Sequence, residues 1–296
     1  MMQLHDVEVE DTFAEAFGMW GARIVVTADT PGWADHAARS LTGFATSVIG
    51  CKCEAGVERV LDEEETPDGR PGVAVLLFAP DEEGLGKRLV ERIGMTVLTC
   101  PTTACFNGLE AEDETDVGGK LRYFGDGWQA SKVLDGKRYW RIPVMEGEFL
   151  VEERFGIVEG VGGGNLIMLA EDTATALGAA EAAAAAMRPV EGAILPFPGG
   201  IARSGSKVGS RYSGQMASTN HELCPTLRAQ VDESKVPDGV GSVFEIVIDG
   251  LAPEPVREAM RVGLDAAARS GAKHITAGNY GGNLGEHHFH LKELLP

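Results

Sequence analysis

Residues 73–99 read VAVLLFAPDEEGLGKRLVERIGMTVLT, and this stretch sets out the unit from which the fold is built. Val73–Phe78 is a short apolar run rich in branched side chains, which predicts a buried strand. Glu82–Ile93 has helical character behind an acidic start, which predicts a helix. A further strand is predicted over Met95–Thr99. The stretch therefore predicts a strand, a helix and a second strand in succession.

The residues before this stretch supply a matching set of elements. Arg23–Ala28 is a β-branched run, Trp33–Leu41 has helical character behind Pro31, and a strand is expected at Phe44–Ile49. The first half then has the order strand, helix, strand, strand, helix, strand. That order is typical of the ferredoxin-like arrangement, in which four strands form one antiparallel sheet with both helices on one face.

The second half of the sequence repeats this order. The turns Pro67–Gly69 and Pro237–Gly239 occupy matching positions in the two halves. We therefore predict an α+β fold of two ferredoxin-like lobes related by internal duplication, although two α/β segments can share an order by chance. The predicted domains are residues 1–145, with hairpins inserted from about residue 110, and residues 146–296. The elements expected in the second half are strands at Asn165–Leu169, Ala193–Phe197, Ser242–Ile248 and Lys273–Thr276, and helices at Thr173–Met187 and Glu254–Arg269.

Composition narrows the classes of partner. Of 296 residues, 26 are Lys or Arg and 45 are Asp or Glu, so the formal net charge is −19 at pH 7. Such a charge repels nucleic-acid backbones and anionic membrane surfaces. No run approaches the roughly 18 uncharged apolar residues of a membrane span, and the N-terminus lacks the pattern of a secretory signal. We expect a cytoplasmic protein with small-molecule partners and with free thiols at its five cysteines.

One segment departs from the acidic character of the chain. Residues 192–221 contain no Asp or Glu, while Arg203, Lys207 and Arg211 lie inside the segment. The glycine-rich runs Pro198–Gly200 and Ser204–Ser206 leave backbone N–H groups available to oxygen atoms of a ligand. These features indicate an anionic ligand site. The alternative is a flexible basic loop or a subunit contact.

A single acid interrupts the apolar pattern of a predicted strand near residue 245. Alternation places Phe244, Ile246 and Ile248 on one face of that strand and Glu245 on the other. If the second face is covered, loss of water raises the pKa of the carboxylate toward the range useful for general acid–base catalysis. The alternative is an exposed strand face, where most carboxylates are found.

Motifs for a prosthetic group or a metal are missing. Gly200–Lys207 lacks the Gly-Lys-Ser/Thr order of a phosphate-binding loop, and Gly162–Gly164 precedes a strand instead of following one. We therefore expect no nucleotide cofactor and no metal centre. The cysteine pairs lack zinc-site spacing, and only two of the clustered histidines would share a strand face. These residues are Cys51 with Cys53, Cys100 with Cys105, and His287, His288 and His290.

Two loops that follow predicted strands carry polar groups that could line clefts. Thr99–Thr103 follows the last predicted strand of the first lobe, and Thr276–Gly282 follows that of the second. In the second loop Asn279 and Tyr280 lie among glycines, which permit close approach of the backbone to a ligand.

Eight longer stretches occur in an order that resembles one known family. They are Glu10–Phe17, Thr66–Gly72, Val97–Ala104, Phe124–Gly127, Pro196–Gly200, Ser204–Ser210, Glu245–Gly250 and Ile275–Gly282. In this order they resemble the formylmethanofuran–tetrahydromethanopterin formyltransferases, and the resemblance extends from end to end of the chain. Cys51, Cys53 and the His287–His288 doublet lie outside these motifs, so the resemblance gives them no part in the reaction.

The resemblance implies a function. A formyl group would pass between formylmethanofuran, or a methanofuran analogue, and N5 of tetrahydromethanopterin, directly in a ternary complex and without a prosthetic group. The family also implies a homotetramer and, in methylotrophic bacteria, a place in a formyltransferase/hydrolase complex. A family glutamate implicated in the transfer lies in the motif that begins at Glu245, which assigns a catalytic role to this residue. We expect Arg203, Ser204, Ser206, Lys207, Asn279, Tyr280, Gly281 and Thr102 to bind substrate.

The chemistry of a formyl amide suggests a mechanism. Its carbonyl is a weak electrophile, so hydrogen-bond donors must stabilise the developing oxyanion. Backbone N–H groups of Pro198–Lys207 or of Gly278–Gly282 are the two candidate donors. Glu245 would take the proton from N5 and return it to the departing amine, while Arg203 and Lys207 anchor anionic tails. Two other functions compete with this one: a non-catalytic scaffold subunit of a formyltransferase/hydrolase complex, and a ligand-sensing protein.

Overall fold

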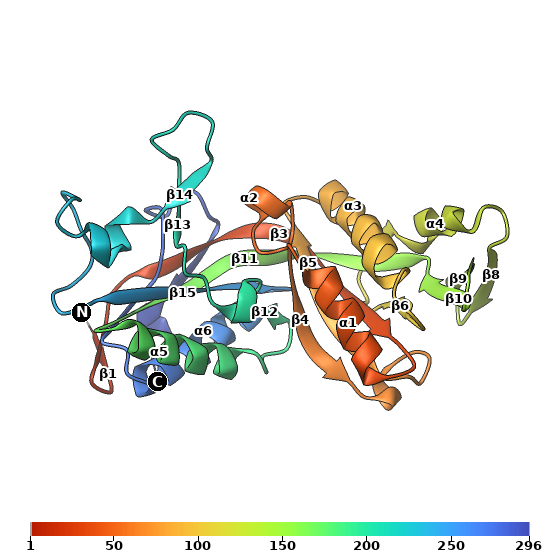
Figure 1. Cartoon of the computed structure of the whole chain (residues 1–296), viewed down its shortest axis with the longest axis horizontal. Coiled ribbons are helices and arrows are strands. Elements are labelled where there is room, and N and C mark those ends of the chain that lie inside the picture. The colour runs from red at the N-terminus through yellow and green to blue at the C-terminus, as the bar shows by residue number, and fades with distance from the viewer. Residues whose placement is uncertain (1, 296) are drawn as a thin grey trace. The chain divides into compact units, whose positions relative to one another are not determined.

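The computed structural model describes residues 2–295, and the chain forms two compact units. The terminal unit comprises residues 1–18 and 161–296, and the central unit comprises residues 19–160. Both boundaries fall inside long strands, because β3 (Phe13–Thr27) and β11 (Arg154–Ala170) each run from one unit into the other. The fold is mixed α/β, with six α-helices in the described part of the chain (Figure 1).

The central unit is built on a sheet of four strands with the antiparallel order β6–β3–β5–β4. Two helices, α1 and α3, pack on one face of this sheet through small and branched side chains such as Ala37, Leu85 and Leu89 (Figure 1). A three-stranded extension, β10–β9–β8, continues beyond β6 as successive hairpins. The remaining elements are α1 (Pro31–Thr42), α2 (Val48–Cys51), β4 (Glu54–Leu61), η1 (Glu63–Glu65), β5 (Gly72–Ala79), α3 (Glu82–Arg92), η2 (Ile93–Val97), β6 (Ala104–Asn107), β7 (Asp113–Asp116), α4 (Gly118–Leu121), η3 (Arg122–Gly125), β8 (Ala130–Leu134), β9 (Lys137–Val144) and β10 (Gly147–Glu152).

The terminal unit repeats the same pairing with different strands. Its antiparallel order is β16–β11–β15–β12, and α5 and α6 cover one face (Figure 1). β2 pairs in parallel with β16, and β17 pairs with the first residues of β3. The remaining elements are β1 (Met2–Leu4), β2 (Val7–Val9), α5 (Thr173–Met187), β12 (Ala193–Ile194), η4 (Pro198–Gly200), β13 (Ser206–Val208), β14 (Ala217–Thr219), η5 (His221–Leu223), η6 (Pro225–Leu227), β15 (Ser242–Gly250), α6 (Pro253–Arg269), β16 (His274–Thr276), β17 (His287–His290) and η7 (Leu291–Glu293).

Two of the helices, α5 and α3, begin where the sequence provides an aspartate cap. Asp172 accepts the backbone N–H of Thr175 at 2.8 Å at the start of α5, and Asp81 accepts that of Gly84 at 2.7 Å at the start of α3. Each cap satisfies an N–H group that the first helical turn leaves without a partner. The predicted helix at 173–187 is confirmed at both ends, and the one at 82–93 to within one residue.

The strand predicted over Phe44–Ile49 is wrong. The chain turns there instead, with Phe44 at φ 51°, and then winds into the short helix α2. Ser47 caps α2 by accepting the N–H of Ile49, so local capping outweighs the β-branched composition of the segment. The second strand of the lobe is β4, which begins at Glu54.

The strand predicted over Met95–Thr99 is also wrong. The chain continues from α3 into η2, one turn of π-helix, and the last strand is β6 at Ala104–Asn107. The hydroxyl of Thr96 donates to the carbonyl of Arg92 at 2.8 Å and supports this winding. Met95 is 70% exposed, so this apolar side chain was not a sign of a buried strand. The predicted strand over Ala193–Phe197 shortens to the two residues of β12.

Candidate active site

Glu245 lies in the middle of β15, on the face of the sheet that the helices leave free. Its neighbours Ile246 and Ile248 point into the helix-covered core. The backbone of Glu245 is fixed twice, opposite Ile167 of β11 and through two hydrogen bonds with Ala202 at 2.8 and 3.0 Å. The side chain keeps some contact with solvent, yet burial raises the pKa of Glu245 to about 7. Its carboxyl group therefore exists in both protonation states near neutral pH.

A cavity of about 600 Å³ opens beside this residue, and we call it the Glu245 cavity. Strand residues Ile167 and Val243 form part of its wall. The segment Ala202–Gly205 and the thiol-bearing residue Cys224 also line it. A volume of this size is typical of small-molecule sites, so the raised pKa of Glu245 and a ligand-sized space occur together.

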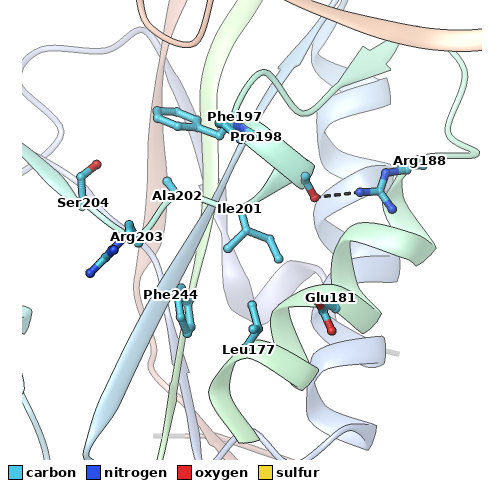
Figure 2. Close-up of a pocket in the computed structure, with 11 residues that line it drawn as sticks. Leu177, Glu181, Arg188, Phe197, Pro198, Ile201, Ala202, Arg203, Ser204 and Phe244 are labelled. Atoms are coloured by element: carbon cyan, nitrogen blue, oxygen red, sulfur yellow. Dashed lines mark hydrogen bonds between the residues drawn. The ribbon is translucent and has the colours of Figure 1, made fainter. Parts of the chain in front are cut away.

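A second cavity of about 680 Å³ adjoins the first, and Figure 2 shows its lining. Leu177 from α5 and Phe244 from β15 lie at one end of this cavity. Phe197 and Pro198, from the segment that follows β12, lie at the other end. Arg188 donates to the carbonyl oxygen of Gly199 at 2.7 Å and fixes this loop, as the dashed line shows. Both cavities are lined by Leu177, Ala202, Arg203, Ser204 and Phe244.

The segment shared by the two cavities carries hydrogen-bond donors without partners. Within residues 2–295, the backbone N–H groups of Arg203, Ser204 and Gly205 make no hydrogen bond. The exposed Arg203 side chain also forms no ion pair within the described chain. Free N–H groups beside a cation form a suitable site for an oxygen atom that carries negative charge.

A buried carboxylate organises the loop that follows β16. Glu15 of β3 is 1% exposed and accepts four backbone N–H groups, at distances of 2.5 to 2.9 Å. Burial alone would raise the pKa of Glu15, but the four hydrogen bonds outweigh it and lower the pKa to about 2. The loop is thus a backbone nest for an anion, occupied by a side chain of the same protein. The four donors are Tyr280, Gly282, Leu284 and Gly285.

This loop holds two residues that the sequence singled out. The Tyr280 ring lies 6.1 Å from that of Phe17, and burial together with the nearby charges of Glu245 and Glu15 raises the pKa of Tyr280. The Asn279 amide donates to Thr12 at 3.0 Å and to the Phe13 carbonyl at 3.2 Å. Tyr280 therefore lies within electrostatic reach of Glu245, whereas the Asn279 side chain fixes the loop to β3.

The bonding of this loop engages most members of one of the two groups of candidate oxyanion donors. The N–H of Gly278 donates to Asn165, that of Gly281 donates to Asn279, and those of Tyr280 and Gly282 donate to Glu15. Four of the five N–H groups of Gly278–Gly282 are therefore engaged within the protein. The segment at 203–205 offers more unengaged backbone donors within the described residues and is the stronger candidate for the oxyanion donors.

Three other predicted site residues are not among those that line the two cavities. Ser206 and Lys207 belong to β13, which pairs with β14 in a separate two-stranded ribbon, and neither lines either cavity. Thr102 lies in the central unit at φ 64°, a strained conformation for a β-branched residue. Its hydroxyl accepts the N–H of Asp29 at 3.2 Å, and its carbonyl accepts Arg70 at 2.6 Å. Thr102 thus has internal partners.

Sequence reasoning missed Glu15 and Cys224. An acid between alanines in the apolar run 13–17 was the available signal for Glu15, because a charge there must be compensated. Nothing in the pattern marked Cys224, which reaches the Glu245 cavity through the turns η5 and η6.

The described residues hold no group of three or more His, Cys, Asp or Glu side chains arranged to bind a metal. The C-terminal histidines form β17 as expected, where the rings of His288 and His290 both lie against Phe13, with centroids 4.8 and 5.2 Å away. Cys51 and Cys53 are free thiols. Among the described helices, none has both the length and the apolar character needed to cross a membrane.

Comparison with known proteins defines the class first. The model of the formylmethanofuran-tetrahydromethanopterin formyltransferase matches residues 2–144, and that of its proximal lobe matches residues 147–294. With a titratable glutamate facing a ligand-sized cavity, the chain is an enzyme of the formyl-transferring acyltransferases. More particularly, it belongs to the formylmethanofuran–tetrahydromethanopterin formyltransferase family.

Individual relatives cover the whole chain. A formylmethanofuran–tetrahydromethanopterin formyltransferase of Methylococcus capsulatus is 54% identical over 99% of this chain and 100% of its own length. A subunit of the formyltransferase/hydrolase complex of Methylorubrum extorquens is 55% identical over 99% of this chain and 97% of its own length. The crystal structure of the formyltransferase/hydrolase complex from Methylorubrum extorquens with methylofuran contains a chain that matches at a TM-score of 0.97 and 53% identity. That match covers 100% of this chain and 99% of the other.

Proposed function

We propose that this protein transfers a formyl group between formylmethanofuran, or a methanofuran analogue, and N5 of tetrahydromethanopterin. The transfer is direct and takes place in a ternary complex. The observation that carries the proposal is the position of Glu245, whose carboxyl group has a pKa of about 7 and faces a cavity of about 600 Å³. A relative named for this reaction aligns with 99% of the chain at 54% identity.

Glu245 is the general base and then the general acid of this proposal. Its carboxylate takes the proton from N5 as the nitrogen attacks the formyl carbon. When the tetrahedral intermediate collapses, the carboxyl group returns that proton to the departing amine, so no proton is gained or lost overall. A group that must work in both directions is most effective when its pKa lies near the working pH. Burial on β15 provides this pKa.

The oxygen of the tetrahedral intermediate needs donors, and we assign them to the segment beside Glu245. The N–H groups of Arg203, Ser204 and Gly205 make no hydrogen bond within the described residues. One well-aligned donor contributes roughly 3 kcal/mol to the stabilisation of an oxyanion. The guanidinium of Arg203 adds positive charge at the same edge of the cavity.

Substrate binding is assigned to the loops around the two cavities. Arg203 and Ser204 line both of them, and we propose that Arg203 anchors an anionic tail. Ser206 and Lys207 extend the basic segment toward longer tails. Tyr280 and Gly281 line neither cavity, and we assign their contacts with substrate to the loop that the Asn279 side chain holds. Thr102, in the central unit, remains a proposed substrate-binding residue.

We also propose a lobe organisation and an assembly for the protein. Two ferredoxin-like lobes related by duplication are supported by the order β6–β3–β5–β4 in one unit and β16–β11–β15–β12 in the other. A division near residue 145 is supported by the two family models, which meet between residues 144 and 147. We propose that the protein works without a prosthetic group, in the cytoplasm, as a homotetramer or as a subunit of a formyltransferase/hydrolase complex. A relative that carries the name of such a subunit supports the second form.

The test is an assay of the purified protein with formylmethanofuran and tetrahydromethanopterin. We expect formyl-pterin to form, and Glu245→Gln to lower kcat by roughly 10²–10⁴-fold with little change in KM. Glu258→Gln, at an exposed position of α6, is the matched control and should retain wild-type rates. Near wild-type turnover of Glu245→Gln would overturn the assignment of this residue.

The competing function is that of a non-catalytic scaffold subunit, and the same assay separates the two. Activity of the lone chain supports the transferase directly. Activity that arises only after the other subunits of a formyltransferase/hydrolase complex are added would mean that partners complete the site. Absence of transfer in both preparations would favour the scaffold.

A further inference from the structure

Two cysteines that the transfer reaction does not use are separated by a single residue in the central unit. Cys51 ends the short helix α2 and is half-buried, whereas Cys53 is buried in the core that α1 and α3 share with the sheet. Lys52 between them has φ 68° and ψ −1°, a left-handed turn. Two extended residues span about 7 Å, which is the limit for a disulfide without backbone movement. The turn at Lys52 brings the two cysteines inside that limit.

A fixed cation contacts the thiol of Cys53 and acts electrostatically on that of Cys51. The Nε of Arg92 donates to the Sγ of Cys53 at 3.1 Å. The other guanidinium nitrogens of Arg92 donate to the carbonyl oxygens of Leu41, Gly43 and Phe44 at 2.5 to 2.9 Å. Because four acceptors hold this guanidinium, its charge cannot swing away from the cysteines.

The surroundings of the two thiols give them different chemistry. Burial opposes ionisation of Cys51, but backbone hydrogen bonds from Ser47 and Thr46 and the charge of Arg92 outweigh it and lower the pKa of this thiol. Burial raises the pKa of Cys53, and Arg92 only partly offsets the rise. Thiolates react with oxidants and thiols do not. Cys51 is therefore the thiol that reacts first with an oxidant. Cys53 is the neighbouring thiol that can then form a disulfide with it.

We propose that Cys51 and Cys53 form an oxidation site for hydroperoxides, with Cys51 as the attacking thiolate and Cys53 as the resolving thiol. The Cys51 thiolate attacks one peroxide oxygen, the O–O bond breaks, and hydroxide or alkoxide leaves. Cys51 is then a sulfenic acid, two electrons more oxidised. The Cys53 sulfur displaces the hydroxyl group as water, and an S–S bond joins the two residues. The hydroperoxide is the only oxidant that the sequence of steps requires.

The other three cysteines lack this combination of features. The charge of Glu146 adds to burial in raising the pKa of Cys100, and complete burial raises the pKa of Cys105. Cys224 donates its thiol to the carbonyl of Asn220 at 3.4 Å, and none of its described contacts is a cation. The structure therefore ranks Cys51 first in reactivity, and the remaining thiols of the chain serve as internal standards.

Closure of the disulfide should also change the contacts of Arg92 near the end of α1. The thiol of Cys53 is one of the acceptors that hold Arg92, and a bond to Cys51 draws that sulfur toward α2. Arg92 then loses one of its partners while it still holds the carbonyls of Gly43 and Phe44. A change in melting temperature between the reduced and oxidised protein should accompany the chemistry.

The first experiment measures the reactivity of thiols in the full chain. Substoichiometric iodoacetamide is added to the reduced protein, and the labelled peptides are quantified by mass spectrometry. We expect Cys51 to be labelled about 10-fold faster than Cys100 or Cys224, because the charge of Arg92 favours the thiolate of Cys51, whereas burial and Glu146 raise the pKa of Cys100. Labelling of Cys51 at or below the rate of Cys224 would overturn the proposal. This measurement needs no substitution, so misfolding cannot obscure it.

The second experiment identifies the product. With hydrogen peroxide, the wild-type chain should lose two hydrogen atoms in intact mass, and a Cys51–Cys53 linked peptide should form that dithiothreitol reverses. Cys53→Ser should instead accumulate a sulfenic acid at Cys51 that dimedone traps, and Cys51→Ser should do neither. Cys100→Ser is the control and should form the same linked peptide as wild type. A wild-type chain that keeps both thiols, or that oxidises Cys100 or Cys224 first, would refute the site.

Discussion

The carboxylate of Glu15 accepts the backbone N–H of Tyr280 at 2.5 Å, which ties the loop beside the Glu245 cavity to a strand 265 residues earlier in the chain. The same carboxylate accepts three further N–H groups from Gly282, Leu284 and Gly285. Within the described residues this 1% exposed charge has backbone dipoles, and no cation, as its partners. Together with the Asn279 amide, this side chain fixes the backbone at Tyr280, a residue whose pKa the charge of Glu245 helps to raise.

Replacing Glu15 by Gln should loosen that loop. An amide offers one acceptor oxygen and turns an NH₂ group toward donors that it cannot satisfy, so some of the four hydrogen bonds are lost. Hydrogen bonds to charged groups contribute about 1.5–3 kcal/mol each, and we expect the free energy of unfolding to fall by roughly 3 kcal/mol. Hydrogen exchange should accelerate at residues 280, 282, 284 and 285 in particular. Glu286→Gln, exposed in the same loop, is the control.

The activity of the Glu15 variant gives a second readout. Turnover should fall with the ordering of the loop, and millimolar acetate should restore part of it in Glu15→Gly, because the empty nest can bind a free carboxylate. Chloride at equal ionic strength should not restore it. Unchanged exchange in the loop, or turnover equal to that of Glu286→Gln, would show that Glu15 does not hold Tyr280.

The raised pKa of Glu245 predicts a stability that depends on pH. The folded-state pKa is about 7 and the ordinary value is 4.5, so the folded protein binds more protons between these values. This contribution is fully present below pH 4.5 and is lost as pH rises toward and through 7, at up to about 1.4 kcal/mol per pH unit. Gln at this position does not ionise. The difference in Tm between Glu245→Gln and wild type should therefore increase from pH 5 to pH 8, and parallel profiles would contradict the pKa.

Arg203 should contribute to substrate affinity in a way that Arg211 does not. Both belong to the basic segment, but only Arg203 lines the two cavities. Loss of a charge-assisted hydrogen bond corresponds to about a 10-fold rise in KM. We expect that rise for Arg203→Ala at low salt, with a smaller difference from wild type at high salt because of screening. An equal effect of Arg211→Ala would point to the overall charge of the segment instead.

Two glycines should respond in opposite ways to alanine. Gly178 in α5 is exposed, and a Cβ there meets nothing within 4 Å, so Gly178→Ala should raise the free energy of unfolding by about 1 kcal/mol. A Cβ at Gly285 would collide with the carbonyl oxygen of Ala16 and crowd the side chain of Glu15. Gly285→Ala should lower both stability and turnover. Chemical denaturation with activity measurements checks the pair.

The parts of the fold that the sequence predicted are those set by local patterns. The helix 173–187 follows from an alanine-rich run with an aspartate cap, and β5 and β15 follow from apolar runs bounded by turns. The strands predicted at 44–49 and 95–99 are wrong, because Ser47 and Thr96 support helical winding through hydrogen bonds that the apolar composition of these segments does not reveal. Glu245 was singled out for the same local reason, as an acid within an alternating strand.

The sequence by itself determined the order of the elements, the basic character of residues 192–221 and the candidacy of Glu245, since each depends on residues close together in the chain. Only the tertiary structure decided which donors are free. The N–H groups near residue 280 are engaged by Glu15, while those of Arg203, Ser204 and Gly205 are without partners in the described chain. Which backbone groups face water, a carboxylate or a cavity depends on contacts between distant segments, and periodicity carries no information about such contacts.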